Sequence, residues 1–292
     1  MKNLQLISNY KTNGNHRASF NALAKKVYGL DFEPWYKKGF WLDNYVPYSF
    51  MDGEKIVANV SINKMEMIIE GEMKKALQIG TVMTHPDYRK QGLSGKLMNH
   101  ILEKYENEYD LMFLFANPTV YNFYPKFGFE YFKEHCFAAP VKVEQTERTG
   151  IRKLDMNNEE DYNIIRRLMA NRKAISQTLG FEKDEYLLLF YGLYVFGGSL
   201  YYLEAEDTIV IYQKEEDKLN IFDIIGEHSL SFNHLMNRIA TTEIKEVLFH
   251  FTPDFKDVEV TSKVYESDYR VFIKNAPSKM PEKFLFPITS HA

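Results

Sequence analysis

The sequence predicts a mixed α+β fold built from two similar units. Apolar residues alternate with a period of two in several stretches and recur every three or four residues in others, which indicates strands and amphipathic helices. In the first half, three strands precede the first crossover helix, so the sheet is expected to be mixed and mostly antiparallel rather than doubly wound. The second half repeats this order of elements, which indicates an internal repeat of architecture at low sequence similarity.

The first half is expected to begin with a short strand within residues 1–10, a helix over residues 16–29 and a short aromatic-rich helical segment over residues 32–41. A three-stranded meander follows. Its strands are expected at residues 48–51, 55–69 and 75–83, with turns at Asp52-Gly53 and at residues 70–72.

The pattern then changes to the helical period. Leu93, Leu97, Ile101 and Tyr105 lie four residues apart and give one apolar face, so a helix is expected to begin near Gly92. The rest of this half is expected to form a strand at residues 111–116, a short helix at 119–126 and a strand at 129–139 that ends before Pro140.

A polar segment at residues 144–152 is expected to separate two domains, 1–144 and 145–292. In the second domain, helices are expected at residues 159–175, 182–194 and 231–240. Strands are expected at residues 200–204, 208–214, 218–225, 247–251 and 269–274.

The composition excludes several classes of protein. Lys and Arg number 36 against 40 Asp and Glu, and the net charge of -4 gives no overall basis for binding nucleic acid. The single cysteine, Cys136, excludes an intramolecular disulfide and a cysteine-rich metal site, and no metal is expected. No apolar run is long enough to span a membrane and the N-terminus lacks a signal-peptide core, so we expect a cytoplasmic protein with no membrane partner.

The most informative stretch opens the helix after the meander. It reads Arg89-Lys90-Gln91-Gly92-Leu93-Ser94-Gly95. The first backbone N–H groups of a helix lack internal partners and favour an anion, and the small residues allow a ligand to approach the backbone. The stretch therefore suits a pyrophosphate, although glycines at a helix start also serve as ordinary caps.

The context of this loop carries a family resemblance. Arg89-x-x-Gly92-x-Ser94 follows a strand, and a helix, a strand and Tyr124-Pro125-Lys126-Phe127-Gly128-Phe129 come after it. This arrangement resembles the GNAT N-acetyltransferase superfamily, with its [QR]-x-x-G-x-[GA] loop and its Y-x-x-x-G-[FY] element. Ser94 stands where Gly or Ala is usual. The resemblance covers about residues 1–140.

The resemblance implies a GNAT fold, a splayed sheet with flanking helices, and acetyl-CoA as co-substrate. The loop from Arg89 to Gly95 would hold the pyrophosphate, and the backbone of Val82 and Met83 would hold the pantetheine arm. Asn117 would contact the coenzyme, unless it is a turn residue before Pro118. Tyr124 would protonate the leaving thiolate after direct attack by a primary amine in a ternary complex. A phenol suits this step because its ordinary pKa, about 10, exceeds that of a thiol.

The motif does not identify the general base. Glu66, His85 and Asp87 are candidates by position, and each is also typical of a solvated surface group. Cys136 with His135 could suggest an acyl-cysteine route. Because neighbours on a strand point to opposite faces, a buried structural thiol is the better interpretation.

The second half lacks both motifs and is expected to be a degenerate GNAT-like domain that shapes the acceptor site, with the aromatic segment 32–41 as the near wall. The tandem arrangement resembles enhanced-intracellular-survival-type acetyltransferases without their third domain. The expected partner is a small-molecule or peptide amine, and an oligomer is left open. The alternative functions are an acetyl-CoA-binding sensor and an interaction protein, both without transferase activity.

Overall fold

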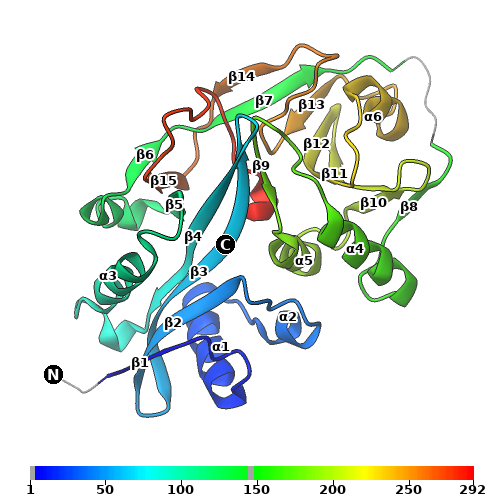
Figure 1. The fold of residues 1–292 in the computed structure, drawn as a ribbon. Helices are drawn as coiled ribbons and strands as arrows, with labels where there is room; N and C mark the ends of the chain where they lie inside the picture. Colours follow the sequence, from blue (N-terminus) through cyan, green and yellow to red (C-terminus); the bar gives the residue numbers. More distant parts are fainter. Residues whose placement is uncertain (1–3, 144–147) are drawn as a thin grey trace.

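The structure is a computed structural model that describes residues 4–143 and 148–292. It contains two mixed sheets with helices packed against them (Figure 1). The strands of the first sheet are β1 (Gln5–Ser8), β2 (Tyr45–Asp52), β3 (Lys55–Ile69), β4 (Glu72–Thr84), β5 (Leu111–Ala116), β6 (Glu130–Phe132), β9 (Leu179–Glu182) and β15 (Arg270–Lys274). Those of the second sheet are β7 (His135–Pro140), β8 (Ile151–Lys153), β10 (Leu200–Leu203), β11 (Thr208–Glu215), β12 (Lys218–Ile225), β13 (Glu246–Phe249) and β14 (Thr261–Val264).

The helices are α1 (Gly14–Tyr28), α2 (Glu33–Lys37), α3 (Leu93–Tyr105), α4 (Glu159–Asn171), α5 (Glu185–Tyr194) and α6 (Phe232–Ile239). Short 3₁₀ turns occur at Pro86–Tyr88, Pro118–Val120, Tyr124–Phe127 and Ile288–Ser290. The local signals act as expected at α1, which is capped by the Asn13 side chain and ends at Gly29 with φ 72°.

The two halves repeat one architecture. α3 lies between β4 and β5 in the chain, and these strands pair in parallel; α6 lies in the same way between the parallel strands β12 and β13. In both sheets an antiparallel meander precedes this unit. The structure therefore has the predicted α+β class and the predicted tandem GNAT-like order.

The two sheets exchange strands. β15 comes from the second half of the chain but pairs with β5 and β6 in the first sheet. β7 comes from the first half but pairs with β13 and β14 in the second sheet. The predicted division into 1–144 and 145–292 therefore does not separate the strands of the two sheets, and residue 144 itself lies outside the described residues.

The exchange also corrects one expected strand. Residues 129–139 form two strands, β6 and β7, which belong to different sheets and are separated at Lys133-Glu134. The apolar pattern continues across this break, so periodicity alone does not reveal it. The expected helix 119–126 is also wrong, because the chain forms two separate 3₁₀ turns there, around Pro118 and Pro125.

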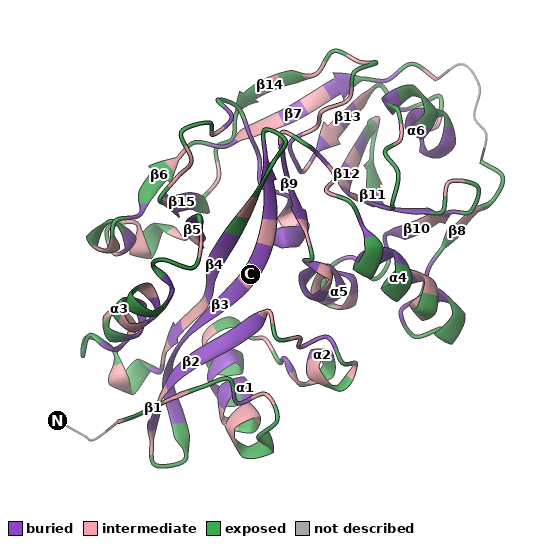
Figure 2. Ribbon diagram, in the orientation of Figure 1, coloured by how far each residue is buried: buried purple, intermediate pink, exposed green. Residues whose placement is uncertain are grey.

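The central strands β3 and β5 of the first sheet are buried on both faces (Figure 2). Met112 and Leu114 of β5 pack with the buried face of α3 on one side. Leu111 and Phe113 of the same strand face the other side, where α1, α2 and α5 pack. Trp35 Nε1 of α2 donates a 3.0 Å hydrogen bond to the Tyr186 carbonyl of α5 and so connects the two halves of the chain on that side.

Candidate active site

The neighbouring strands β4 and β5 separate before they end. Their parallel pairing runs from Ala76 opposite Leu111 to Ile79 opposite Leu114, whereas β4 continues to Thr84. The register against β3 shifts near Thr81, which adopts a φ of 48°. A bulge of this kind bends a strand, so it accounts for the divergence of β4 from β5.

Two hydrogen bonds fix the bulge. The Asn59 side chain donates to the Thr81 carbonyl at 2.9 Å, and the Tyr45 hydroxyl donates to Thr81 Oγ1 at 3.0 Å. Asn59 and Tyr45 are buried. The opening between the strands is therefore part of the folded framework.

The predicted anion loop lies beside this opening. Gly92 caps α3 with a φ of 74°, and Lys90 also has a positive φ of 60°. A Cβ at Gly92 would meet no atom within 4 Å, so glycine is required here for its backbone conformation. Ser94 Oγ and Thr84 Oγ1 lie 2.8 Å apart, and Arg89 Nε donates to the Thr84 carbonyl at 3.4 Å, so the loop is tied to the end of β4.

A cavity of about 1700 Å³ joins the loop, the strand opening and the second half of the chain. Of the predicted site residues, those in its wall are Val82, Met83, Arg89, Ser94, Asn117 and Tyr124. The others belong to the loop but not to the wall: Lys90, Gln91, Gly92, Leu93 and Gly95. The Leu93 side chain packs in the core under α3 and is therefore not a ligand contact.

Tyr124 is a buried tyrosine in the cavity wall. It is 5% exposed and contacts the rings of Phe123, Phe129 and Phe272. Burial, with a smaller contribution from Tyr28, raises the pKa of Tyr124 well above its usual value. The hydroxyl therefore keeps its proton at neutral pH.

Asn117 and Tyr28 make hydrogen bonds within the protein that limit the predicted coenzyme contacts. Asn117 Oδ1 accepts a 3.0 Å hydrogen bond from the Thr119 N–H, which is the turn role, and its amide nitrogen is the part left for a ligand in the wall. Tyr28, which the sequence did not single out, donates its hydroxyl to the Val82 carbonyl at 2.5 Å. Sequence patterns do not reveal this contact because it joins α1 to β4 across 54 residues.

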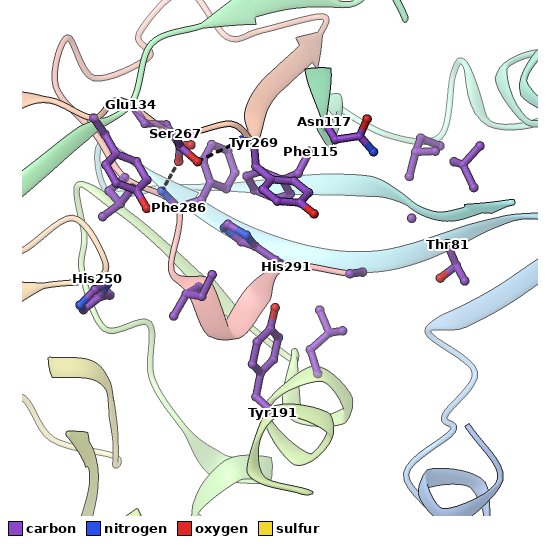
Figure 3. Close-up of a pocket in the computed structure, with 18 of the residues that line it drawn as sticks. Thr81, Phe115, Asn117, Glu134, Tyr191, His250, Ser267, Tyr269, Phe286 and His291 are labelled. Atoms are coloured by element: carbon purple, nitrogen blue, oxygen red, sulfur yellow. Dashed lines mark hydrogen bonds between the residues drawn. The ribbon is translucent and has the colours of Figure 1, made fainter. Parts of the chain in front are cut away.

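The C-terminal tail, residues 285–292, lines the same cavity. The His291 ring stacks on Phe115 with 3.6 Å between centroids. The backbone of Ala292 lies 3.0 Å from where a Cβ would stand on Gly80, so a side chain at this point of β4 would require Ala292 to shift by a few tenths of an ångström. Figure 3 shows His291 between Phe115 and Tyr191. Burial lowers the pKa of His291 to about 3, so its ring is neutral.

A buried ion-pair cluster holds this tail. Both nitrogens of the Arg172 fork donate to Asp223 at 3.1 Å, and Arg172 lies 3.7 Å from Asp184. Thr289 donates to Asp223 at 2.5 Å and Ser290 donates to Asp184 at 2.9 Å. The cluster therefore positions the tail of the second half against the first sheet.

None of the three candidate bases lies in the cavity wall. Glu66 pairs with Lys183 at 2.5 Å, and Asp87 is an exposed surface group. His85 is buried beside Lys55, and burial together with that cation lowers its pKa.

Cys136 differs from the sequence expectation. It is half-buried in the cavity wall, and its thiol donates to the Lys263 carbonyl at 3.6 Å, so it is not a fully buried core thiol. The expected aromatic wall is formed in part, because Phe32 and Trp35 line the cavity while Phe40 and Trp41 pack in the core.

Comparison with known proteins agrees with this geometry. Residues 13–132 match the family model described as an acetyltransferase (GNAT) domain. A search of the curated proteins finds no significant match. Within the described residues, no helix has both the length and the apolarity to cross a membrane.

Several solved structures share the fold over most of the chain. A probable N-acyltransferase from Enterococcus faecalis aligns with a TM-score of 0.61 and 16% identity over 92% of this chain and 71% of that one. Eis1 from Mycobacterium abscessus aligns with a TM-score of 0.57 and 11% identity, covering 92% and 72%. A GCN5-related N-acetyltransferase from Kribbella flavida gives 0.54 and 15%, covering 93% and 71%. At these identities the similarity concerns the fold.

Proposed function

We propose that this protein transfers an acetyl group from acetyl-CoA to a primary amine. The observation that carries the proposal is the single cavity that joins the anion loop, the separated strands and Tyr124. The loop offers backbone N–H groups and Arg89 to a pyrophosphate. Beyond Ile79 the edge of β4 is no longer paired with β5, and Val82 and Met83 of this segment line the cavity where the pantetheine arm would lie, although the Val82 carbonyl already accepts from Tyr28.

Each chain residue has a defined role in the proposed reaction. The coenzyme supplies the activated thioester. As the acceptor nitrogen forms its bond to the acyl carbon and the C–S bond breaks, Tyr124 would donate its proton to the departing sulfur. Glu66, His85 and Asp87 do not line the cavity, and we assign the proton lost by the amine to water.

We propose one coenzyme per chain, bound by the first half. In the second half, the N-terminus of α6 is already occupied by a carboxylate: the Phe232 and Asn233 N–H groups each donate to Asp257 at 2.9 Å. The tail bridges β12 and β13, the strands that correspond to β4 and β5. The Ile288 N–H donates to the His250 carbonyl after β13, and Thr289 donates to Asp223 of β12. The chain's own groups thus fill the positions that a second coenzyme would need.

The second half is proposed to shape the acceptor site. It contributes wall residues from α5, from β13 and from the segment after β14, among them Phe190, Tyr191, Leu248 and Tyr265. Phe190 and Tyr191 pack on the face of the first sheet opposite α3, which is the side left to the acceptor if the coenzyme enters over α3.

Calorimetric titration with acetyl-CoA and turnover with a panel of amines test the proposal. We expect a stoichiometry of one and release of CoA that depends on the amine. Binding without turnover on any amine would favour the sensor instead, and a stoichiometry of two would contradict the filled second site. Propionyl-CoA in the same assay tests the preference for an acetyl group.

A further inference from the structure

A buried carboxylate in the cavity wall has no role in the reaction described above. Glu134 lies at the break between β6 and β7 and is 7% exposed. Its Oε1 accepts a 2.9 Å hydrogen bond from the Phe286 N–H, which fixes the side chain against the tail (Figure 3). The backbone on both sides is held as well, since the Glu134 carbonyl accepts from Tyr265 and His135 N–H donates to Phe284.

Glu134 lacks a cationic partner among the described side chains. Arg270, the cation on the neighbouring strand, lies over the rings of Tyr121 and Tyr131 at 4.3 and 5.0 Å. Lys218 pairs with Glu246 at 3.1 Å on the far wall. Burying an ionised carboxylate without a counter-charge is unfavourable, and burial accordingly raises the pKa of Glu134 to about 7.

The surroundings of Glu134 suit a cation. Tyr265, Tyr269 and Phe286 line the cavity beside it, and Ser267 adds a hydroxyl. Aromatic faces attract ammonium and guanidinium groups, most strongly where water is excluded. Glu134 and these rings, of which Tyr265 and Tyr269 are exposed to solvent, can therefore accept a cationic group of a ligand.

The position of Glu134 fits the acceptor rather than the coenzyme. The Phe286 ring packs on Phe113 and Phe115 at 5.0 and 5.6 Å, on the face of the sheet opposite α3. His291 then lies between Phe115 and the strand opening at Gly80. Aromatic side chains thus stand between Glu134 and the opening, so Glu134 would contact a part of the acceptor remote from the reacting nitrogen.

We propose that Glu134 binds a second, positively charged group of the acceptor, so that the preferred acceptors are diamines or related dications. This inference rests on the proposed acetyl transfer, because the reacting amine must reach the opening while its distant cation reaches Glu134. Glu134 is then a specificity-determining residue, and the reaction itself does not need it.

The test compares α,ω-diamines of four to eight carbons with the monoamines of the same length. Wild-type protein should show a kcat/KM at least about tenfold higher for the best diamine than for its monoamine. In Glu134→Gln that preference should fall by about 10–100-fold, as expected for a lost hydrogen bond between charged groups, while kcat/KM for the monoamine stays within about threefold. Glu266→Gln, which removes an exposed carboxylate from the same wall, is the matched control and should keep the preference.

The outcomes separate the two proposals. Loss of acetyl-CoA binding or of all turnover in wild-type protein would contradict the proposed function. In that case calorimetry of the diamine with the protein alone still tests the inference, which requires binding that Glu134→Gln removes. The inference would be overturned if wild-type protein showed no preference for the diamine, or if Glu134→Gln lowered kcat/KM equally for the diamine and the monoamine. If Glu134→Gln does not fold, Glu134→Asp, which keeps the charge, should retain part of the preference.

Discussion

The Ser290 hydroxyl donates a 2.9 Å hydrogen bond to Asp184 Oδ2, and both side chains are buried. The two residues lie 106 positions apart in the sequence. Through this bond and the neighbouring one from Thr289 to Asp223, the second half holds the tail that lines the cavity at Gly80. The ion-pair cluster thereby connects the fold of the second half to the shape of the acyl site.

Replacing the tail hydroxyls should therefore weaken acceptor recognition. Ser290→Ala removes the hydroxyl that donates to the buried Asp184 Oδ2, at a cost of about 1–3 kcal/mol. Thr289→Val removes one of two donors to Asp223 Oδ2, which still accepts from Arg172, so its cost should be smaller, about 1 kcal/mol. We expect a lower melting temperature, a higher KM for the amine and an unchanged Kd for acetyl-CoA. The control is Ser229→Ala, at an exposed position. An unchanged amine KM in a destabilised variant would show that the tail has no part in the acceptor site.

Tyr124→Phe should reduce kcat and leave coenzyme affinity nearly unchanged. The hydroxyl is assigned only to protonation of the sulfur, and general acid catalysis contributes about 10²–10⁴-fold. Steady-state kinetics with a good amine, together with calorimetry for acetyl-CoA, measure both quantities. Tyr109→Phe, outside the cavity, serves as the control. An unchanged kcat would mean that water protonates the thiolate or that a later step limits turnover.

Gly92→Glu should abolish acetyl-CoA binding. The substitution places a non-glycine residue at a φ of 74° and a negative charge where the pyrophosphate is proposed to bind. Gly53→Glu introduces the same residue at a φ of 60° in the turn between β2 and β3. If both variants lose binding equally, backbone strain rather than the loop is responsible.

The stability of the protein should fall as the pH rises through the titration of Glu134. The native pKa is about 7 and the ordinary value is 4.5, so between these values the native state binds more protons than the unfolded state. Stability from this group is therefore greatest below about pH 4.5 and is lost by about pH 7. Glu134→Gln should be more stable than wild type by about 3 kcal/mol at pH 8, with the difference closing near pH 4.5. Urea denaturation across this range measures it, and a difference independent of pH would contradict the assignment.

A fragment that ends at residue 144 should not fold on its own. It keeps β5 but lacks β15, whose five residues pair with β5 from Met112 to Ala116. It also contains β7 but lacks β13 and β14, the strands with which β7 pairs in the second sheet. Circular dichroism and coenzyme binding by the fragment are the measurements. A folded fragment with unchanged amine KM would contradict both this expectation and the proposed role of the second half.

The local signals in the sequence predicted many elements closely. β3 and β5 have the expected limits of residues 55–69 and 111–116, because alternation, apolar runs and turn residues act over short distances. The short strands β8, β9 and β14 were not predicted. β9, for example, is defined by its pairing with the distant residues 66–69 of β3, and its own pattern is too short to indicate a strand.

The residues of the candidate site likewise include some that sequence motifs predict and some that they do not. The loop from Arg89 to Gly95 and Tyr124 follow from contiguous motifs, and the structure brings Arg89, Ser94 and Tyr124 to one cavity. Glu134 and His291 carry no motif. The Glu134 side chain is fixed by a hydrogen bond from the Phe286 N–H, 152 residues later. Such positions depend on tertiary contacts that periodicity and spacing do not report.

The exchange of strands has a consequence for synthesis on the ribosome. β5 ends at Ala116, but β15, which pairs with β5 on the side away from β4, begins only at Arg270, more than 150 residues later. At roughly 5–20 residues per second, the growing chain presents that unpaired edge for roughly 8–30 s. Open strand edges invite pairing with other chains. We therefore expect translation speed and chaperone supply to control the yield of native protein more strongly than its final stability does.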